Sequence, residues 1–327
     1  MFEFVTGGGL GDAPLPPSLF WEAEHIQSAL LKDLLAIPGL SITALRDARW
    51  PAPAELESAI TWKIIAPGEG FQAVWHSTLA ENEAVWPIAP ESSGLLEQLC
   101  HEVESAGKVL LNCPAQAVRL AGSKRDTIER LAQNAVPVVP TCGLKGLRPK
   151  FPLIIKPDDG IGCTGLRILR CEEDWNTALC EIDPSLYVVQ PLLEGDSLSL
   201  SVLFERGESL VLSCNRQTLR RRGDRMQLES VEVNALPVTP AHHQLATAVA
   251  EAMPELWGYA GIDLLDLCGT PTVLEINPRL TTSSAGLREA LGINLAEAVI
   301  KMARQQPWRS GLIRTVNRSV TITWPLT

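Results

Sequence analysis

The sequence predicts an α/β domain over residues 1–120, followed by an α+β region whose strands are mostly antiparallel. Two observations carry this prediction. In the first part, short apolar runs alternate with segments of helical periodicity, which is typical of a parallel sheet covered by helices. In the second part, strand-like runs follow one another across short glycine-containing turns, which is typical of hairpins.

The N-terminal domain opens with an apolar strand over residues 2–5, which leads into the glycine-rich loop Thr6-Gly7-Gly8-Gly9-Leu10-Gly11. Loops at the carboxyl ends of strands are where open α/β sheets bind ligands. A structural turn explains these glycines equally well. The other elements expected in this domain are helices over 18–35, 71–80 and 94–106 and strands over 41–45, 62–66 and 84–89.

The α+β region follows with a different order of elements. An amphipathic helix over 123–134 comes first, and a second helix over 172–181 interrupts the strands. The expected strands are 151–156, 166–169, 186–190, 198–204, 209–214, 261–267 and 272–277. A solvated loop is one explanation of the crowded arginines between positions 216 and 225, and a functional role is the other.

Composition excludes several classes of protein. Lys and Arg total 28 against 38 Asp and Glu, and this net charge of −10 argues against a general nucleic-acid-binding protein. The eight cysteines are scattered without a CxxC pair, so the sequence indicates neither a zinc site nor a redox motif. No apolar run approaches the roughly 18 residues of a membrane span. The first residues do not resemble a signal peptide. We therefore expect a cytoplasmic protein that acts on small molecules.

A glycine motif lies in residues 151–170, which read FPLIIKPDDGIGCTGLRILR. Gly160, Gly162 and Gly165 fit the pattern GxGxxG, which must open a helix in a dinucleotide-binding fold. Here a run with strand alternation follows, so the motif predicts a hairpin. Glycines in such a hairpin allow backbone N–H groups to converge on a phosphate, and Lys156 ends the strand before it. An exposed turn beside a solvated lysine is the alternative.

An acidic motif lies in residues 261–279, which read GIDLLDLCGTPTVLEINPR. Glu275 and Asn277 alternate on a predicted strand and therefore point to the same face. A short turn around Gly269 brings Asp263 of the preceding strand near Glu275. Two carboxylates and an amide oxygen are suitable ligands for Mg²⁺. A solvated polar face of the sheet is the alternative explanation.

These features follow one another in an order that resembles the ATP-grasp superfamily over about residues 123–300. The order is Lys124 at a helix start, Lys156 before the glycine hairpin, Gln190-Pro191-Leu192-Leu193-Glu194-Gly195, Asp263, and Glu275-Ile276-Asn277-Pro278-Arg279. The resemblance implies an α/β N-terminal domain over 1–120 followed by an α+β ATP-grasp fold. In this fold, one lobe over 121–188, with the glycine hairpin, and another over 189–327, with the metal site, would clamp ATP.

The resemblance also implies a role for each matching residue. The ATP-binding residues would be Lys124, Lys156, Gly160, Gly162, Gly165, Gln190, Pro191, Leu192 and Glu194. The Mg²⁺ ligands would be Asp263, Glu275 and Asn277, and Arg279 would face the transferred phosphate with Asn277 beside it. We also expect Arg216 to be catalytic, because it follows the strand 209–214 opposite the expected γ-phosphate, and arginine suits bidentate contact with phosphate.

Two positions depart from the ATP-grasp pattern. Ser123 stands where many members carry an acidic residue, and Ser197 stands where many carry a glutamate that binds ribose. Asp196 and Glu194 are the nearby acidic side chains that offer a substitute for the ribose contact.

A narrower resemblance covers more of the chain. The segments FEFVTGGG, Trp21-Glu22-Ala23-Glu24, Leu45-Arg46-Asp47-Ala48-Arg49 and Ile88-Ala89-Pro90-Glu91 resemble the tyramine–glutamate ligase group of methanofuran-type cofactor biosynthesis. This resemblance implies an ATP-dependent carboxylate–amine ligase that forms an amide through an acyl phosphate, with glutamate and tyramine or a similar amine as partners. A non-catalytic ATP-binding module of the same fold is the alternative, and a homodimer is one option for its assembly. Glu3, Glu22 and Glu24 are candidates to bind the cationic amine, with helix solvation as the alternative for Glu24.

Overall fold

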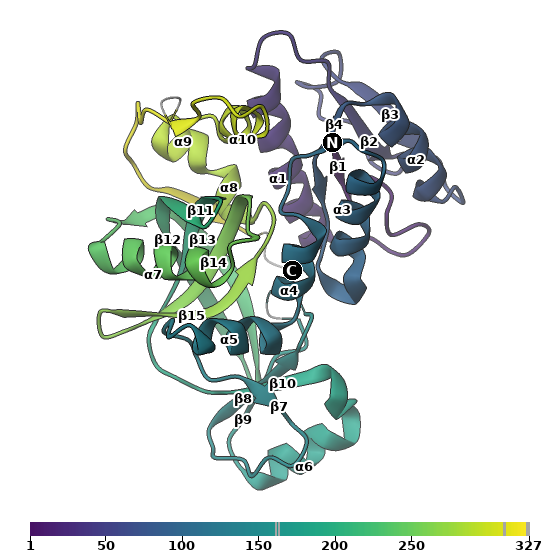
Figure 1. Cartoon of the computed structure of the whole chain (residues 1–327). Coiled ribbons are helices and arrows are strands. Elements are labelled where there is room, and N and C mark those ends of the chain that lie inside the picture. The colour runs from purple at the N-terminus through teal and green to yellow at the C-terminus, as the bar shows by residue number, and fades with distance from the viewer. Residues whose placement is uncertain (161, 163, 310–311, 325–327) are drawn as a thin grey trace.

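The computed structural model describes residues 1–160, 162, 164–309 and 312–324 (Figure 1). Cys163 of the scattered cysteine set lies outside the described residues. Figure 1 shows a small sheet with α6 at one end of the molecule and α8 to α10 at the other, with a larger sheet between them. None of the helices in the described part of the chain is long and apolar enough to cross a membrane.

The N-terminal part has parallel strands and covering helices, as expected. The strand pairs are β1 (Phe2–Glu3) with β5 (Pro87–Ile88), β2 (Thr43–Asp47) with β3 (Thr61–Ile65), and β4 (Ala84–Val85) with β6 (Val109–Leu110). The helices are α1 (Pro17–Leu35), α2 (Phe71–Glu81), the short η1 (Ser92–Gly94), α3 (Leu95–Ser105) and α4 (Ala115–Gly122). The structure adds β6 and α4 to the expected elements.

Aromatic packing joins the first strand to the helices. The ring of Phe2 is fully buried and lies 5.2 Å from the rings of Phe71 and Trp75. Such side chains each bury a large apolar area, so they dominate the energetics of a small core. The glycine-rich loop that follows β1 is consequently held at a defined position, with Gly7 N–H donating to Glu3 O at 2.8 Å.

A small antiparallel sheet forms the next lobe, and the glycine motif lies in its hairpin. The sheet order is β7 (Cys142–Gly143), β10 (Tyr187–Pro191), β8 (Leu153–Pro157) and β9 (Arg167–Leu169). Helix α5 (Lys124–Gln133) precedes the sheet, and α6 (Glu172–Glu181) and the short η2 (Pro184–Leu186) connect β9 to β10. Ile154 pairs with Ile168 in an antiparallel register, which confirms a strand–loop–strand hairpin in place of a helix.

The largest sheet has six antiparallel strands. Their order is β15 (Thr270–Asn277), β14 (Gly258–Leu267), β11 (Asp196–Glu205), β12 (Glu208–Arg222), β13 (Arg225–Leu236) and β16 (Val320–Thr323). Helix α7 (Pro240–Ala252) contacts β11, β12 and β15, and α8 (Thr282–Ala285), α9 (Leu287–Leu291) and α10 (Leu295–Ala303) follow β15. Apolar side chains of β11 alternate between two cores, with Leu200 and Val202 in one and Leu203 in the other.

Of the two explanations of the arginine run, the solvated loop is wrong. The arginines belong to β12 and β13, a long hairpin that turns at Gly223, where φ is +67°. Arg216 lies opposite Glu232, and Arg220 forms an ion pair with Glu229. Cross-strand pairs of opposite charge stabilise these two strands, although apolar and polar residues do not alternate along them. The segment therefore lacks the sequence pattern from which a strand is usually predicted.

Candidate functional site

Two lysines from different elements converge on one glutamate of the large sheet. Lys124 is the first residue of α5, Lys156 lies on β8, and the Nζ of each is 3.5 Å from Oε2 of Glu275. The three side chains are only 7%, 10% and 13% exposed, so two positive charges and one negative charge are buried together. Burial acts to raise the pKa of Glu275, but the charges of Lys124 and Lys156 outweigh it and lower that pKa. Glu275 is therefore an ionised carboxylate.

Asp263 lies directly beside this cluster. It pairs with Glu275 across β14 and β15, as expected, while Gly261 pairs with Asn277. The Nδ2 of Asn277 donates to Oδ2 of Asp263 at 3.1 Å, and the Nε2 of Gln217 donates to Oδ1 at 3.0 Å. Burial and then the charge of Glu275 raise the pKa of Asp263 to about 7. The pair therefore carries less negative charge than two ordinary carboxylates.

The oxygen atoms of this group suit a hard divalent cation. Asp263 and Glu275 each offer a carboxylate, and Asn277 retains its side-chain carbonyl oxygen because its amide nitrogen is the donor to Asp263. Two like charges on one sheet face need either a cation or a raised pKa, and Asp263 shows the raised pKa. Mg²⁺ commonly binds one or two carboxylates and completes its shell with phosphate oxygens and water. Within the described residues, no group of three or more His, Cys, Asp or Glu side chains has the arrangement of a metal site. The set is therefore suited to a shared metal and phosphate site.

The glycine hairpin is tied to the same cluster. The Nζ of Lys124 donates to the backbone oxygens of Gly160 and of Asp158, the latter at 3.3 Å. The side chain of Asp158 accepts hydrogen bonds from the Ser123 hydroxyl at 2.8 Å and the Arg125 N–H at 2.9 Å. The start of α5 therefore holds the start of the loop. Ser123 also caps α5 by accepting from the N–H of Asp126, which gives this departure from the family pattern a structural role.

The end of the hairpin loop requires glycine at Gly165. Its φ is +73°, and an added Cβ would lie 2.8 Å from Cγ of Pro157. Gly162 also has a positive φ of +56°, but an added Cβ there would meet nothing within 4 Å. The two glycines therefore satisfy different needs, close packing at Gly165 and backbone conformation alone at Gly162.

The expected hinge runs beside the strand that carries Lys156. Val188 of β10 pairs with Lys156, and Pro191 pairs with Leu153. The side chain of Gln190 is buried and donates to the Thr141 hydroxyl at 2.7 Å. The N–H of Leu192 donates to the backbone oxygen of Pro152 at 3.2 Å. The backbone of β10 therefore runs beside Lys156, whereas the side chain of Gln190 is directed to Thr141.

The hinge ends at Glu194 and Gly195, which differ in their surroundings. The side chain of Glu194 is exposed. An added Cβ at Gly195 would lie 2.7 Å from the backbone oxygen of Asp266, so close approach of the two segments requires glycine there. Beyond it, the Ser197 hydroxyl donates to Gln217 at 2.9 Å, and Gln217 in turn donates to Asp263. Ser197 is thereby connected to the acidic pair.

Of the two arginines expected to be catalytic, the structure brings only Arg279 toward the strand ends near the cluster. Its guanidinium is 13% exposed, and Nε lies 3.0 Å from Oε1 of Glu91 in the N-terminal part. Burial would lower the pKa of Arg279, but the charges of Glu91 and Glu22 raise it. Arg216 is exposed and pairs with Leu198, which also pairs with Leu264. Because cross-strand partners share a face and neighbours alternate, Arg216 lies on the face opposite Asp263.

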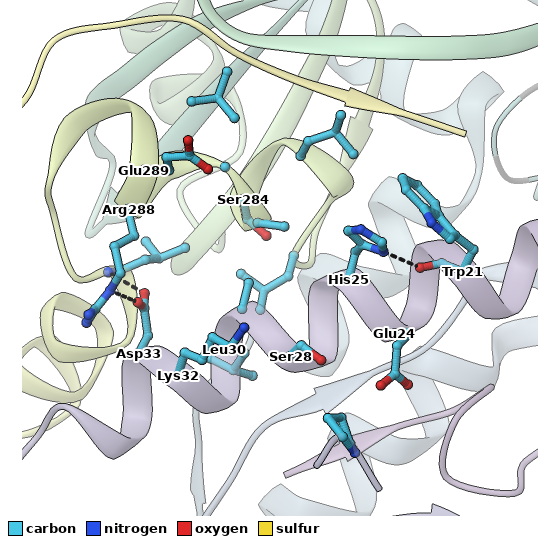
Figure 2. Close-up of a pocket in the computed structure, with 18 of the residues that line it drawn as sticks. Trp21, Glu24, His25, Ser28, Leu30, Lys32, Asp33, Ser284, Arg288 and Glu289 are labelled. Atoms are coloured by element: carbon cyan, nitrogen blue, oxygen red, sulfur yellow. Dashed lines mark hydrogen bonds and ion pairs between the residues drawn. The ribbon is translucent and has the colours of Figure 1, made fainter. Parts of the chain in front are cut away.

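A separate cavity of about 810 Å³ lies between α1, α8, α9 and β16 (Figure 2). None of the residues expected to bind ATP or metal belongs to the described lining. Its charged side chains are largely paired, for example Arg288 of α9 with Asp33 of α1 at 2.5 Å, and Figure 2 shows this contact. His25 Nδ1 lies 2.8 Å from the backbone oxygen of Trp21. The cavity is therefore distinct from the lysine–carboxylate cluster.

The chain matches two domain families along most of its length. Residues 40–118 match the pre ATP-grasp 3 domain, and residues 121–283 match the ATP-grasp domain. Together with the lysine–carboxylate cluster, these matches show that the chain belongs to the ATP-grasp superfamily. The resemblance and the fold class expected from the sequence are thus confirmed.

The chain is also similar to individual curated proteins. The chain is 30% identical to tyramine–L-glutamate ligase of Methanocaldococcus fervens over 226 residues, which are 67% of this chain and 65% of that relative. The ligase of the same name from Methanocaldococcus jannaschii is 28% identical over 220 residues, 67% of this chain and 62% of the relative. The matched region thus spans slightly less than two thirds of the length of these relatives.

Solved structures agree on the fold. A putative ATP-grasp superfamily protein from Archaeoglobus fulgidus has a TM-score of 0.72 at 21% identity, covering 98% of this chain and 90% of that one. An L-amino acid ligase from Bacillus licheniformis has a TM-score of 0.67 at 20% identity, covering 93% and 76%.

Two residues of the site were not anticipated from sequence. Gln217 lies within the arginine run, where no strand was expected. Glu91 was noted only as part of a motif, and its contact with Arg279 joins residues 188 positions apart.

Proposed function

We propose that this chain is an ATP-dependent carboxylate–amine ligase that forms an amide through an acyl phosphate. The observation that carries the proposal is the convergence of Lys124, Lys156, Glu275 and Asp263 between the two lobes. A carboxylate is a poor acylating agent because oxide would have to leave. Transfer of the γ-phosphoryl group of ATP to that carboxylate provides phosphate as the leaving group, and an amine then displaces it.

The residues of the cluster fit the needs of phosphoryl transfer, which are positioning and charge neutralisation. Asp263, Glu275 and Asn277 would hold Mg²⁺, which would neutralise charge on the β- and γ-phosphates. Lys124 and Lys156 would turn from Glu275 to phosphate oxygens, a charge-assisted contact. The backbone N–H groups of the glycine hairpin would add further donors, and Arg279 would face the transferred phosphate.

The adenine would lie along the hinge from Gln190 to Leu192, with Glu194 near its exposed end. We further propose that the acid is glutamate and the amine is tyramine or a similar primary amine, because both curated relatives bear that name. We retain the division into an N-terminal domain over 1–120 and lobes over 121–188 and 189–327 as part of this proposal.

The test is product formation by the purified chain. With Mg²⁺, ATP, glutamate and tyramine, we expect release of ADP and phosphate and a new amide detected by mass spectrometry. Asn277→Ala is expected to abolish the amide. The absence of ADP release across a broad panel of acids and amines would refute the proposal.

A non-catalytic ATP-binding module is the second candidate, and Ser197 in place of a ribose-binding carboxylate is the observation that favours it. Calorimetry separates the two functions, because a module binds ATP with Mg²⁺ and releases no ADP with any acid and amine.

A further inference from the structure

Glu91 is a buried carboxylate with unused hydrogen-bonding capacity. It is 8% exposed and lies 3.0 Å from Nε of Arg279. Within the described residues, neither Glu91 oxygen accepts a hydrogen bond and Nε of Arg279 donates none, although the two side chains form an ion pair. Buried polar atoms without a partner are rare in native proteins, and each one asks for an explanation. A donor that arrives with a ligand is such an explanation.

Glu22 is a second carboxylate at the same junction. It lies on α1 and accepts a hydrogen bond from the Thr282 hydroxyl at 2.5 Å, and Thr282 follows Arg279 by three residues. Among the residues that the structure describes, Glu22 has no ion-pair partner, whereas its charge and that of Glu91 both act on Arg279. Two carboxylates thus share one guanidinium, which leaves one negative charge in excess.

The other two glutamates considered for the amine are already engaged. The carboxylate of Glu3 accepts from the N–H of Val5 at 3.2 Å and from the N–H and hydroxyl of Thr6, each at 2.7 Å. Glu24 forms an ion pair with the buried Arg46 at 2.6 Å, and Figure 2 shows it on the side of α1 away from His25. Glu3 therefore shapes the first glycine loop, and Glu24 stabilises the N-terminal core.

We infer that the ammonium group of the amine substrate binds between Glu91 and Glu22. This inference rests on the proposed function. An ammonium group has three donors and no acceptor, so it donates to the Glu91 oxygens, neither of which accepts a hydrogen bond within the described residues, and contacts Glu22 as well. Its charge cancels the excess negative charge, whereas a carboxylate would be repelled from the same position. Since Arg279 follows Asn277 by two residues, the bound amine lies next to the proposed metal and phosphate site.

The first experiment measures amine binding without turnover. Tyramine is titrated by calorimetry into wild type, Glu22→Gln and Glu91→Gln, each with Mg²⁺ and ADP. We expect both variants to bind tyramine about 10- to 100-fold more weakly, the effect of losing a charged hydrogen bond. Glu208→Gln is the matched control, because Glu208 is exposed and paired with Arg309 at 2.6 Å far along the sheet. We expect Glu208→Gln to bind tyramine with the affinity of the wild type.

Two outcomes of the titration overturn the inference. One is equal affinity for tyramine in wild type and both variants. The other is no binding of either tyramine or phenethylamine by the wild type. The uncharged analogue 4-ethylphenol checks the role of the ammonium group, since its binding is expected to be the same in all four proteins.

The second experiment separates amine binding from the positioning of Arg279. Hydroxylamine is a neutral nucleophile that captures an acyl phosphate as a hydroxamate. We expect both variants to lose more of the rate of amide formation with tyramine than of the rate of hydroxamate formation from glutamate and ATP, so that the ratio of the two rates falls about tenfold or more. An equal loss of amide and hydroxamate formation in both variants would show that the glutamates only position Arg279, which overturns the inference. A wild type that forms no hydroxamate from any acid would refute the proposed function instead, while the titration still decides where the amine binds.

Discussion

Replacing Glu275 by glutamine is expected to destabilise the protein strongly, because it leaves two buried lysines without their shared partner. Each Nζ lies 3.5 Å from the carboxylate, which corresponds to about 5 kcal/mol per lysine at an effective dielectric constant of about 20. Rearrangement and hydration of the freed charges reduce the net effect. Loss of one partner from a buried ion pair typically costs about 3–5 kcal/mol, and we expect Glu275→Gln to lie in that range.

Urea unfolding at pH 7 without nucleotide, followed by the fluorescence of the nine tryptophans, measures this loss. Glu208→Gln is the control, since an exposed ion pair contributes about 1 kcal/mol or less. Adding Lys156→Met to Glu275→Gln removes one of the stranded charges and is expected to recover part of the stability. Inorganic triphosphate should stabilise Glu275→Gln more than wild type, because it supplies the missing negative charge.

The pH dependence has a defined sign. Burial lowers the pKa of Lys156 and Glu275 raises it, so removing the carboxylate lowers that pKa further. The destabilisation should therefore shrink as the pH rises from 7 to 10 and Lys156 loses its proton. An unfolding free energy within about 1 kcal/mol of wild type at pH 7 would refute the reasoning, since it is the effect of an exposed pair.

Three further predictions concern the same site. Lys156→Ala should weaken ATP binding about 10- to 100-fold in calorimetry, and an unchanged dissociation constant would show that Lys156 does not contact phosphate. Because the pKa of Asp263 is about 7, Mg²⁺ affinity in the presence of ADP should fall by about tenfold per unit as the pH drops below 7; a titration that gives the same affinity at pH 6 and 8 contradicts this. Gly165→Ala should cost about 1–3 kcal/mol in thermal or urea unfolding, owing to its φ of +73° and its contact with Pro157. Gly162→Ala is the matched control for backbone conformation alone, and an equal loss in both variants would remove the packing argument.

Sequence alone predicts the parts of the site whose geometry is local. The hairpin between β8 and β9 follows from strand alternation on both sides of the glycines. Glu275 and Asn277 share a face because they are two residues apart on one strand. Asp263 comes near them because a short turn joins β14 to β15, and their direct pairing follows from that connection.

The parts that sequence does not predict depend on contacts between distant segments. Gln217 reaches Asp263 only because β12 extends to Arg222, and exposed arginines hide the strand pattern there. Arg216 was expected at the γ-phosphate, yet the register with Leu198 turns it to the other face. Alternate residues of a strand point to opposite faces of the sheet. An error of one residue in the expected register therefore places the Arg216 side chain on the wrong face.

The partners within the cluster explain how charged groups can be buried between the lobes and still bind a charged ligand. Glu275 is neutralised by Lys124 and Lys156, and Asp263 accepts from Gln217 and Asn277, so the buried charges and polar atoms of the cluster are paired inside the protein. In the proposed function, phosphate oxygens replace Glu275 as the partner of the lysines, and Mg²⁺ replaces the lysines as the partner of Glu275. Each group thus exchanges one partner for another of the same sign of charge, and the desolvation of these side chains has already occurred on folding. Phosphate alone would leave Glu275 unpaired and Mg²⁺ alone would leave the lysines unpaired, so this arrangement selects the two together.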